Sequence, residues 1–327
     1  MTTVGTHREQ IPVHVLGGPT ALFEYGGLRF LTDPTFDAPG EYQGGMLTKT
    51  APAAPVELGR IDVVLLSHDE HPDNLDNSGR ALLDTVPLTL TTPGGGQRLG
   101  NSARGLADWE SIELDRPDGG TITVTGVPAI HGPGTRAEVE AVLGQVVGFV
   151  LSGTDLPTVY VSGDNASLEV VREIADRCGP PDTAILFAGA PRFPILFDGA
   201  AIVFDSARAA RAAEILGARR VVPVHYDGWA HFTEGRAELM AAFAAAGLAD
   251  RLDLRAGNIA EGPTLEPKRS GDAAPEKDRS DTAVRKPSRS DTAARDLGRS
   301  DGAAQDPGRS DTAAQGKGRV GGVGTRS

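Results

Sequence analysis

The sequence has a single cysteine, Cys178, among its 327 residues. One thiol cannot form a disulfide within the chain, and it excludes a zinc site built from several cysteines. Long apolar runs are also missing, because no stretch approaches the roughly 18 consecutive apolar residues of a membrane span. The opening residues, MTTVGTHREQIPVHVLGG, lack the basic start, apolar run and cleavage site of a secretion signal. We therefore expect a soluble cytoplasmic protein with no membrane partner.

Positive charge is in short supply. The chain holds 32 Lys and Arg against 44 Asp and Glu, which gives a formal net charge of −12. A nucleic-acid-binding surface needs a local surplus of Lys and Arg to neutralise phosphates, so no nucleic-acid partner is expected. Hydrophobic residues make up 39% of the chain, accompanied by 42 Gly and 23 Pro. This composition is sufficient for a full core connected by many turns.

The last part of the chain has no aromatic residues. From Arg269 onward an Arg-Ser pair recurs every ten residues as far as Ser310, and three of the repeats read RSDTA. So little apolar surface cannot offset the ordering entropy of about 1–2 kcal/mol per residue. We predict a folded domain over residues 1–265 and a disordered, low-complexity tail over residues 266–327. Residues 268–327 hold 13 Lys and Arg against 9 Asp and Glu, so the acidic excess belongs to the domain.

Residues 11–262 combine short β-type runs with helical stretches. Two glycine pairs, Gly17-Gly18 and Gly26-Gly27, fit hairpin turns between the opening strands. The predicted strands are Val13–Leu16, Ala21–Tyr25, Leu28–Thr32, Val63–Ser67, Leu88–Thr91, Thr121–Val127, Val146–Ser152, Thr158–Ser162, Thr183–Phe187 and Arg220–Val224. The predicted helices are Asn77–Asp84, Leu168–Arg177, Ser206–Leu216 and Gly235–Ala246. Early hairpins followed by strand–helix alternation indicate a layered α/β architecture.

A cluster of histidines and carboxylates follows the strand predicted at residues 63–67. It reads His68-Asp69-Glu70-His71-Pro72-Asp73-Asn74. Imidazole nitrogen and carboxylate oxygen are ligands that Zn²⁺ accepts, and a site richer in oxygen also suits Mn²⁺ or Fe²⁺. A solvated polar turn is the alternative interpretation of the same residues.

Three further candidates also stand at strand ends: His131, Asp164 and His225. Each has an ordinary alternative, since a single His is often a core or surface residue and Asp164 could cap the helix predicted from Leu168. Their order along the chain is more informative than any one of them. Groups separated by whole strand–helix units can reach one edge of a layered fold, where binding sites are commonly built from loops.

Taken together, these motifs resemble the metallo-β-lactamase superfamily, and within it the branch of ascorbate-6-phosphate lactonase-like and N-acylphosphatidylethanolamine phospholipase D-like proteins. The resemblance covers residues 11–261 and includes Leu31-Thr32-Asp33-Pro34, Gly163-Asp164 and Pro223-Val224-His225. It implies an α/β fold of the four-layer αββα type, with one or two metal ions at the edge of the sandwich. The ligands that it implies are His68, His71, Asp73, His131, Asp164 and His225.

Two departures from the family pattern affect the metal centre. The loop has one extra residue between its imidazoles, so either His68 or Asp69 could stand in the first ligand position. Asn74 occupies the place of a histidine that serves the second metal, and an amide oxygen is a poorer Zn²⁺ ligand than imidazole. We therefore expect one tightly bound ion, Zn²⁺ with Mn²⁺ or Fe²⁺ as alternatives, and a second, labile one.

The resemblance implies a metal-dependent hydrolase, in which metal-bound hydroxide attacks a small-molecule lactone, ester or phosphoester. Asp73 would ligate the second metal or act as a base on the attacking water. His231 and Trp229 could line the substrate pocket, with His231 acting as an acid or oxyanion donor or serving only in packing. Asp33 would orient a ligand imidazole or simply form an Asp-Pro turn.

Two other functions compete with small-molecule hydrolysis. A non-catalytic metal- or partner-binding protein could retain the fold, as the Asn74 departure and the long tail suggest. A nuclease of the same superfamily is less favoured because of the acidic domain. Sequence alone identifies neither the substrate nor the oligomeric state.

Overall fold

The computed structural model describes residues 10–53 and 58–254. These residues belong to the first of two units of the chain, Met1–Leu265. The tail predicted over residues 266–327 lies outside the described residues.

The first sheet combines a meander with parallel strands. In spatial order its strands are β1 (Val13–Gly17), β2 (Thr20–Tyr25), β3 (Leu28–Thr32), β6 (Val63–Leu65), β7 (Leu88–Thr91) and β8 (Ala103–Gly105). Strands β1 to β3 pair antiparallel, whereas β3, β6, β7 and β8 pair parallel. The turn between β2 and β3 uses Gly26 and Gly27, whose φ angles of 58° and 85° favour glycine.

The second sheet repeats this plan in the second half of the domain. In spatial order its strands are β14 (Arg220–Val224), β13 (Thr183–Phe187), β12 (Val159–Val161), β11 (Val147–Gly153), β10 (Thr121–Pro128) and β9 (Ser111–Asp115). Strands β9 to β12 pair antiparallel, and β12, β13 and β14 pair parallel. As a result, β10, β12, β13 and β14 all run in the same direction.

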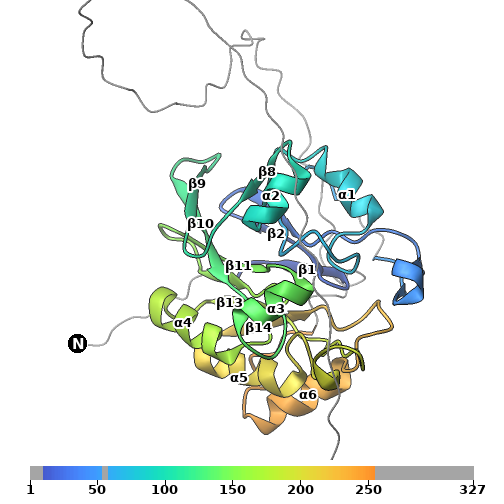
Figure 1. The fold of residues 1–327 in the computed structure, drawn as a ribbon. Helices are drawn as coiled ribbons and strands as arrows, with labels where there is room; N and C mark the ends of the chain where they lie inside the picture. The colour runs from blue at the N-terminus through green and yellow to red at the C-terminus, as the bar shows by residue number, and fades with distance from the viewer. Residues whose placement is uncertain (1–9, 54–57, 255–327) are drawn as a thin grey trace, which may run out of the picture. The chain divides into compact units, whose positions relative to one another are not determined.

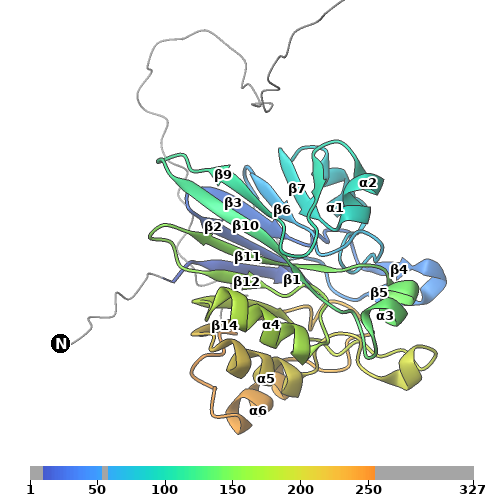
Figure 2. The same cartoon turned by 60° about the vertical axis from the view of Figure 1, so that its left-hand side comes forward.

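Helices cover the outer face of each sheet, which gives four layers (Figures 1 and 2). Helices α1 (Asn77–Leu83) and α2 (Pro93–Leu99) lie on the side of the first sheet. On the side of the second sheet lie α4 (Leu168–Cys178), α5 (Ser206–Leu216) and α6 (Arg236–Ala245). The remaining elements are α3 (Arg136–Leu143), the hairpin β4 (Gly40–Tyr42) and β5 (Leu47–Lys49), and the short 3₁₀ turns η1 (Gln43–Gly45) and η2 (Phe197–Gly199). The predicted αββα sandwich is confirmed.

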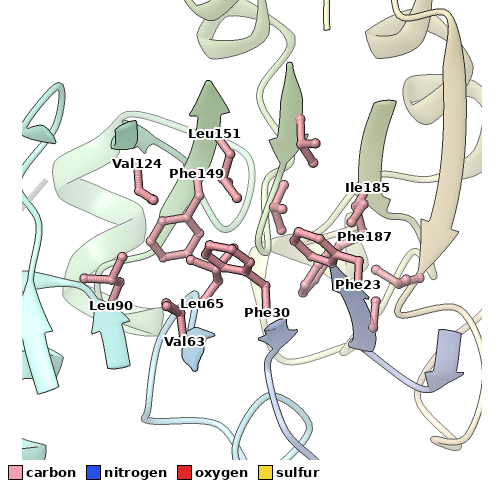
Figure 3. Close-up of a cluster of buried hydrophobic side chains, with 14 of the residues drawn as sticks. Phe23, Phe30, Val63, Leu65, Leu90, Val124, Phe149, Leu151, Ile185 and Phe187 are labelled. Atoms are coloured by element: carbon pink, nitrogen blue, oxygen red, sulfur yellow. The ribbon is translucent and has the colours of Figure 1, made fainter. Parts of the chain in front are cut away.

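Successive side chains of a strand point to opposite faces of the sheet, so one apolar run contributes to two separate hydrophobic cores. On β13, Ile185 and Phe187 point between the two sheets, whereas Ala184 and Leu186 face the α4–α5–α6 layer. Parallel strands covered on both faces lose the polar alternation of a solvated sheet, which is why this run contains no polar residue after Thr183. The central core between the sheets includes Phe23, Phe30, Phe149 and Phe187 (Figure 3).

Helix ends decide one alternative left open by the sequence. The N-cap of α5 is Asp205, which accepts a hydrogen bond from the backbone of Arg208, and the helix ends at the left-handed Gly217. Helix α4 is capped by Ser167, so Asp164 does not serve as its cap. Helices α2 and α3, the β4–β5 hairpin and strands β8 (Ala103–Gly105) and β9 (Ser111–Asp115) are absent from the sequence prediction, because they are short. Within the described part of the chain, no helix combines the length and apolar character needed to span a bilayer.

Candidate metal centre

The predicted site residues stand at the carboxyl ends of four strands. His68 lies three residues after β6, His131 three after β10, Asp164 three after β12, and His225 directly follows β14. Since β10, β12 and β14 run in the same direction, their ends meet at one edge of the second sheet. The β6 loop reaches the same edge, because the Val147 amide at the start of β11 donates to the Ser67 carbonyl at 3.1 Å.

Three imidazoles form the compact part of the site. His68 Nε2 lies 2.8 Å from His71 Nδ1, and the His131 ring centroid lies 5.4 and 5.3 Å from those of His68 and His71. One nitrogen of each ring lies within 4.8 Å of the other two. In the described residues, this is the one group of three or more His, Cys, Asp or Glu side chains spaced to hold a metal ion. Small movements of the rings would bring these nitrogens to zinc–nitrogen bond lengths of about 2.0–2.1 Å.

A buried hydrogen-bond relay orients His68. The Ser67 hydroxyl donates to Asp33 Oδ1 at 2.6 Å, and the Ser67 amide donates to the same oxygen at 3.0 Å. Because that hydroxyl hydrogen is already used, Ser67 Oγ accepts the hydrogen of His68 Nδ1 at 3.0 Å. The lone pair of His68 Nε2 is thereby aimed at the cluster. Asp33 thus acts through Ser67 on a ligand imidazole, an arrangement typical of metal sites.

The backbone fixes His131 in the complementary way. Its Nδ1–H donates to the Ile202 carbonyl at 3.0 Å, so Nε2 carries the lone pair and faces Asp164 Oδ2 at 3.4 Å. Burial, with nearby His71 adding to it, lowers the pKa of His131 to about 3, so the ring is neutral near pH 7. Burial also lowers the pKa of His68 and His71. Neutral imidazole is the form that binds metal.

A second group of side chains converges beside the first. Asp73 Oδ2 lies 2.9 Å from His231 Nε2 and 3.3 Å from His225 Nε2. Asp164 Oδ1 lies 3.7 Å from His225 Nε2, while its other oxygen faces His131. Asp164 therefore stands between the two groups, where a bridging ligand would be placed.

The two carboxylates of the second group differ in their pKa. Burial raises the pKa of Asp164 well above its usual value, and the neighbouring carboxylates Asp73 and Asp33 raise it further. Burial acts in the same direction on Asp73, but His225 and His231 outweigh it and hold the pKa of Asp73 well below its usual value. A positive ion beside Asp164 would remove its electrostatic penalty, which is the general effect of a cation on a buried carboxylate.

Asp69 lies apart from the cluster. Arg98 of α2 binds its carboxylate through two nitrogens, with Nε 3.0 Å from Oδ2 and Nη2 2.5 Å from Oδ1. Arg80 of α1 donates to the Asp69 carbonyl at 2.8 Å. Of the two candidates for the first ligand position, the structure brings His68 to the other imidazoles and turns Asp69 towards α2.

Asn74 is fully buried next to the relay that orients His68. Its Nδ2 lies 3.4 Å from Ser67 Oγ and 3.5 Å from Asp33 Oδ1. Its Oδ1 has no hydrogen-bond partner. The amide thus supports neighbouring polar groups and leaves an oxygen that is a weak ligand at best.

The donor set fits a divalent cation. Several buried polar atoms lack a hydrogen-bond partner, among them Asp164 Oδ1, Asn74 Oδ1 and both ring nitrogens of His225. Buried polar groups without partners are rare and costly. Here the unpartnered atoms gather where acceptors face one another, as His131 Nε2 and Asp164 Oδ2 do. Three imidazole nitrogens suit Zn²⁺, and the added carboxylates also admit Mn²⁺ or Fe²⁺.

Backbone conformation helps these strand ends to meet. His225 has a positive φ of 59°, and its amide donates to the Gly18 carbonyl at 2.6 Å. Such a conformation is uncommon for a non-glycine residue and is held by its surroundings. Gly163 has φ 57°, and a Cβ there would lie 2.8 Å from the Val147 carbonyl oxygen and 2.9 Å from Ser67 Cβ. Glycine is therefore required where the end of β12 meets the β6 loop.

A cavity opens onto the two groups. His71, Asp73, His131 and His231 form part of its wall. The ring of Phe193 stacks on His231, with 5.5 Å between centroids. Trp229 lines a different cavity, so the expectation that it accompanies His231 in this wall is not met.

Sequence reasoning assigned no role to several residues that shape the site. Four groups contact predicted site residues: Ser67, Arg98, Phe193 and the Ile202 carbonyl. Only Ser67 carried a usable signal, because it is adjacent to His68 in the chain. The other three lie far away in sequence from the groups that they contact.

Comparisons with known proteins agree with this architecture. The family model described as the beta-lactamase superfamily domain matches residues 28–226. A UPF0173 metal-dependent hydrolase from Methanosphaerula palustris is 35% identical over 119 residues, covering 34% of this chain and 49% of that protein. A UPF0173 metal-dependent hydrolase from Pyrococcus horikoshii is 24% identical over 212 residues, covering 65% of this chain and 83% of that protein. The first of these alignments spans only about half of the relative's length.

A solved structure shows the same fold. Isothiocyanate hydrolase from Delia radicum gut bacteria superposes with a TM-score of 0.61 at 22% identity, covering 74% of this chain and 94% of that one. Because the family model spans more than half of the chain, the chain belongs to the beta-lactamase superfamily domain family.

Proposed function

We propose that the protein is a metal-dependent hydrolase of small molecules, with His68, His71 and His131 as the main ligands of its metal ion. The observation that carries the proposal is the convergence of three neutral imidazoles from separate strand ends. At least two of them, His68 and His131, have their second ring nitrogen engaged by the protein. Relatives named metal-dependent hydrolases support the same reaction class.

A bound divalent cation would supply a Lewis acid that polarises the substrate and brings the pKa of water towards neutrality. The protein's own groups would then guide the reaction. When the second metal position is empty, Asp73, kept ionised by His225 and His231, accepts a hydrogen bond from the attacking water and orients it. His231 faces the cavity and can donate a proton or hydrogen bond to the leaving group or the developing oxyanion.

The second group is proposed to hold a weaker ion. Asp164 would bridge the two positions, with Asp73 and His225 completing the second one. Asn74, in place of a histidine, contributes no imidazole here, and so a harder ion such as Mn²⁺ is favoured over Zn²⁺.

Within the superfamily we propose a relationship to the ascorbate-6-phosphate lactonase-like and N-acylphosphatidylethanolamine phospholipase D-like branch. From that relationship we take only the reaction class, hydrolysis of a lactone, ester or phosphoester.

The test joins metal content to turnover in the full-length protein. We expect one tightly bound ion per chain by elemental analysis, and hydrolysis of p-nitrophenyl butyrate or bis(p-nitrophenyl) phosphate that a chelator abolishes and added metal restores. His71→Ala should lose both metal and turnover, whereas His14→Ala, which removes an imidazole of β1 outside the cluster, should keep both. Stoichiometric metal without turnover on a broad substrate panel would instead favour a non-catalytic metal-binding protein.

A further inference from the structure

The cavity beside the histidine cluster is mainly apolar away from the candidate site residues. Its accessible volume is about 60 Å³, so it is a small cavity. Apart from the site residues, Gln43 and Pro191, the wall is formed by Met46, Leu47, Leu143, Phe193, Leu196 and Ile202. We propose that this cavity selects substrates in which an uncharged, apolar acyl or alkyl group adjoins the bond to be hydrolysed, and that it rejects those in which that group carries a negative charge. This inference rests on the proposed hydrolase function and names its substrate class.

Among the described residues, no lysine or arginine lines the cavity. The two cationic side chains closest in sequence to its wall are both occupied elsewhere. Arg192, which precedes Phe193, lies 3.6 Å from Glu234 and 3.9 Å from Asp205. Lys49, two residues after Leu47, is buried against Asp76 at 2.9 Å. A phosphate or carboxylate on the substrate would therefore find no cationic partner in this wall.

The wall does contain one acidic side chain. Asp73 is the carboxylate among the described residues that line the cavity. An anionic substituent that is not itself at the cluster would lose its hydration beside this carboxylate without gaining a hydrogen-bond donor. A neutral apolar group would instead replace water against Leu, Ile and Phe side chains. The cavity thus distinguishes the two kinds of substrate in two ways: it favours the neutral apolar group and disfavours the anionic one.

Two loops bring the apolar wall to the reacting groups. The β4–η1–β5 segment supplies Met46 and Leu47, and residues 190–200 supply Phe193 and Leu196. Both loops also expose apolar side chains, with Met46 54% and Ile195 79% exposed. Ile202 lines the cavity, and its backbone carbonyl accepts the hydrogen bond that orients His131. One residue thus contacts both the apolar cavity and a candidate metal ligand. A substrate group packed on this wall would be fixed relative to the cluster.

A matched ester series tests the proposal on the metal-loaded, full-length protein. We expect kcat/KM to rise about fourfold per methylene from p-nitrophenyl acetate to butyrate to hexanoate, because each additional methylene is buried on the apolar wall. The mono-p-nitrophenyl ester of adipic acid has the same chain length as the hexanoate but ends in a carboxylate. It should be poorer by on the order of tenfold or more, because that carboxylate enters an apolar wall without a partner.

A pair of neighbouring substitutions locates the effect. Leu196→Arg places a cation in the wall and should lower the hexanoate rate while raising the rate for the adipate monoester. Ile195→Arg adds the same charge one residue away, outside the cavity wall, and should leave the ratio unchanged. Phe193→Ala should flatten the dependence on chain length. Circular dichroism spectra checked against the parent protein would establish that each variant is folded.

Binding of unreactive probes separates failure of this proposal from failure of the hydrolase proposal. In calorimetric titrations of the metal-free protein, hexanamide should bind more tightly than its terminal carboxylate analogue, and Leu196→Arg should reverse that order. A metal-dependent hydrolase that prefers the charged ester would overturn the substrate class and leave the hydrolase function standing. A metal-bound protein without turnover would refute the hydrolase function, and equal binding of the two probes would then also refute the apolar selection.

Discussion

The two ligand groups of the site differ in how firmly the protein holds them. In the histidine cluster, His68 is fixed by the Ser67–Asp33 relay and His131 by the Ile202 carbonyl. In the second group, Nε2 of His225 and of His231 faces Asp73, and Nδ1 of both rings lacks a hydrogen-bond partner. Outer contacts that fix a ligand's tautomer and direction strengthen metal binding. The comparison therefore predicts a tight first ion and a loosely held second one.

The largest difference should follow from removing one imidazole from each group. His131→Ala should weaken binding of the first ion by more than about 100-fold, because it deletes a direct ligand rather than an outer contact. His225→Ala should leave the first ion bound and affect only the second. Elemental analysis, with titration against a zinc-sensitive chelating dye, measures both. Loss of the first ion from the His225 variant would refute the division into two unequal groups.

A smaller effect should follow from breaking the relay that orients His68. Ser67→Ala removes the acceptor of the His68 Nδ1 hydrogen, and metal affinity should fall by roughly 10–100-fold. Ser111→Ala, on the exposed side of β9, is the matched control and should not alter affinity. If the two serine variants bind metal equally well, the Ser67 hydroxyl does not contribute to tight metal binding by the first group.

The smallest effect on metal binding is expected at Asp69. Asp69→Asn keeps the side-chain volume but weakens the pair with Arg98, whose side chain is 45% exposed, so the cost in unfolding free energy should be roughly 1 kcal/mol. Metal content should remain that of the parent protein. A loss comparable to that of His71→Ala would make Asp69 the ligand and His68 a packing residue. Thermal unfolding alongside elemental analysis distinguishes the two outcomes.

Much of the architecture could be predicted because it is written in local patterns. The runs that end at residues 67, 127, 162 and 224 are apolar enough to be buried strands, and polar metal-binding types follow each of them. The glycine pair of the β2–β3 turn indicates a tight hairpin turn, because both residues adopt the positive φ that glycine favours. By contrast, α2 starts as Pro-Gly-Gly-Gly, which local propensity does not favour as helix. It forms because its residues pack on β7 and β8 and present Arg98 to Asp69.

The choice between His68 and Asp69 could not be made from the loop sequence. Both side chains stand at the end of the same strand, and both are acceptable ligand types. Their different positions depend on Arg98, 29 residues further along the chain from Asp69, which binds that carboxylate. Such partners are brought together only by packing of the outer helices on the sheet.

The amino-acid sequence by itself determined the layered α/β plan and the positions of the candidate ligands at strand ends, because burial and turn formation follow from neighbouring residues. The tertiary structure decided which nitrogen of His68 and His131 faces the cluster, and that Ile202, 71 residues from His131, supplies the fixing carbonyl. It also decided that apolar side chains from two distant loops close over the site while Lys49 and Arg192 pair elsewhere. These outcomes depend on distances between residues far apart in the chain, and local preferences carry no information about such distances.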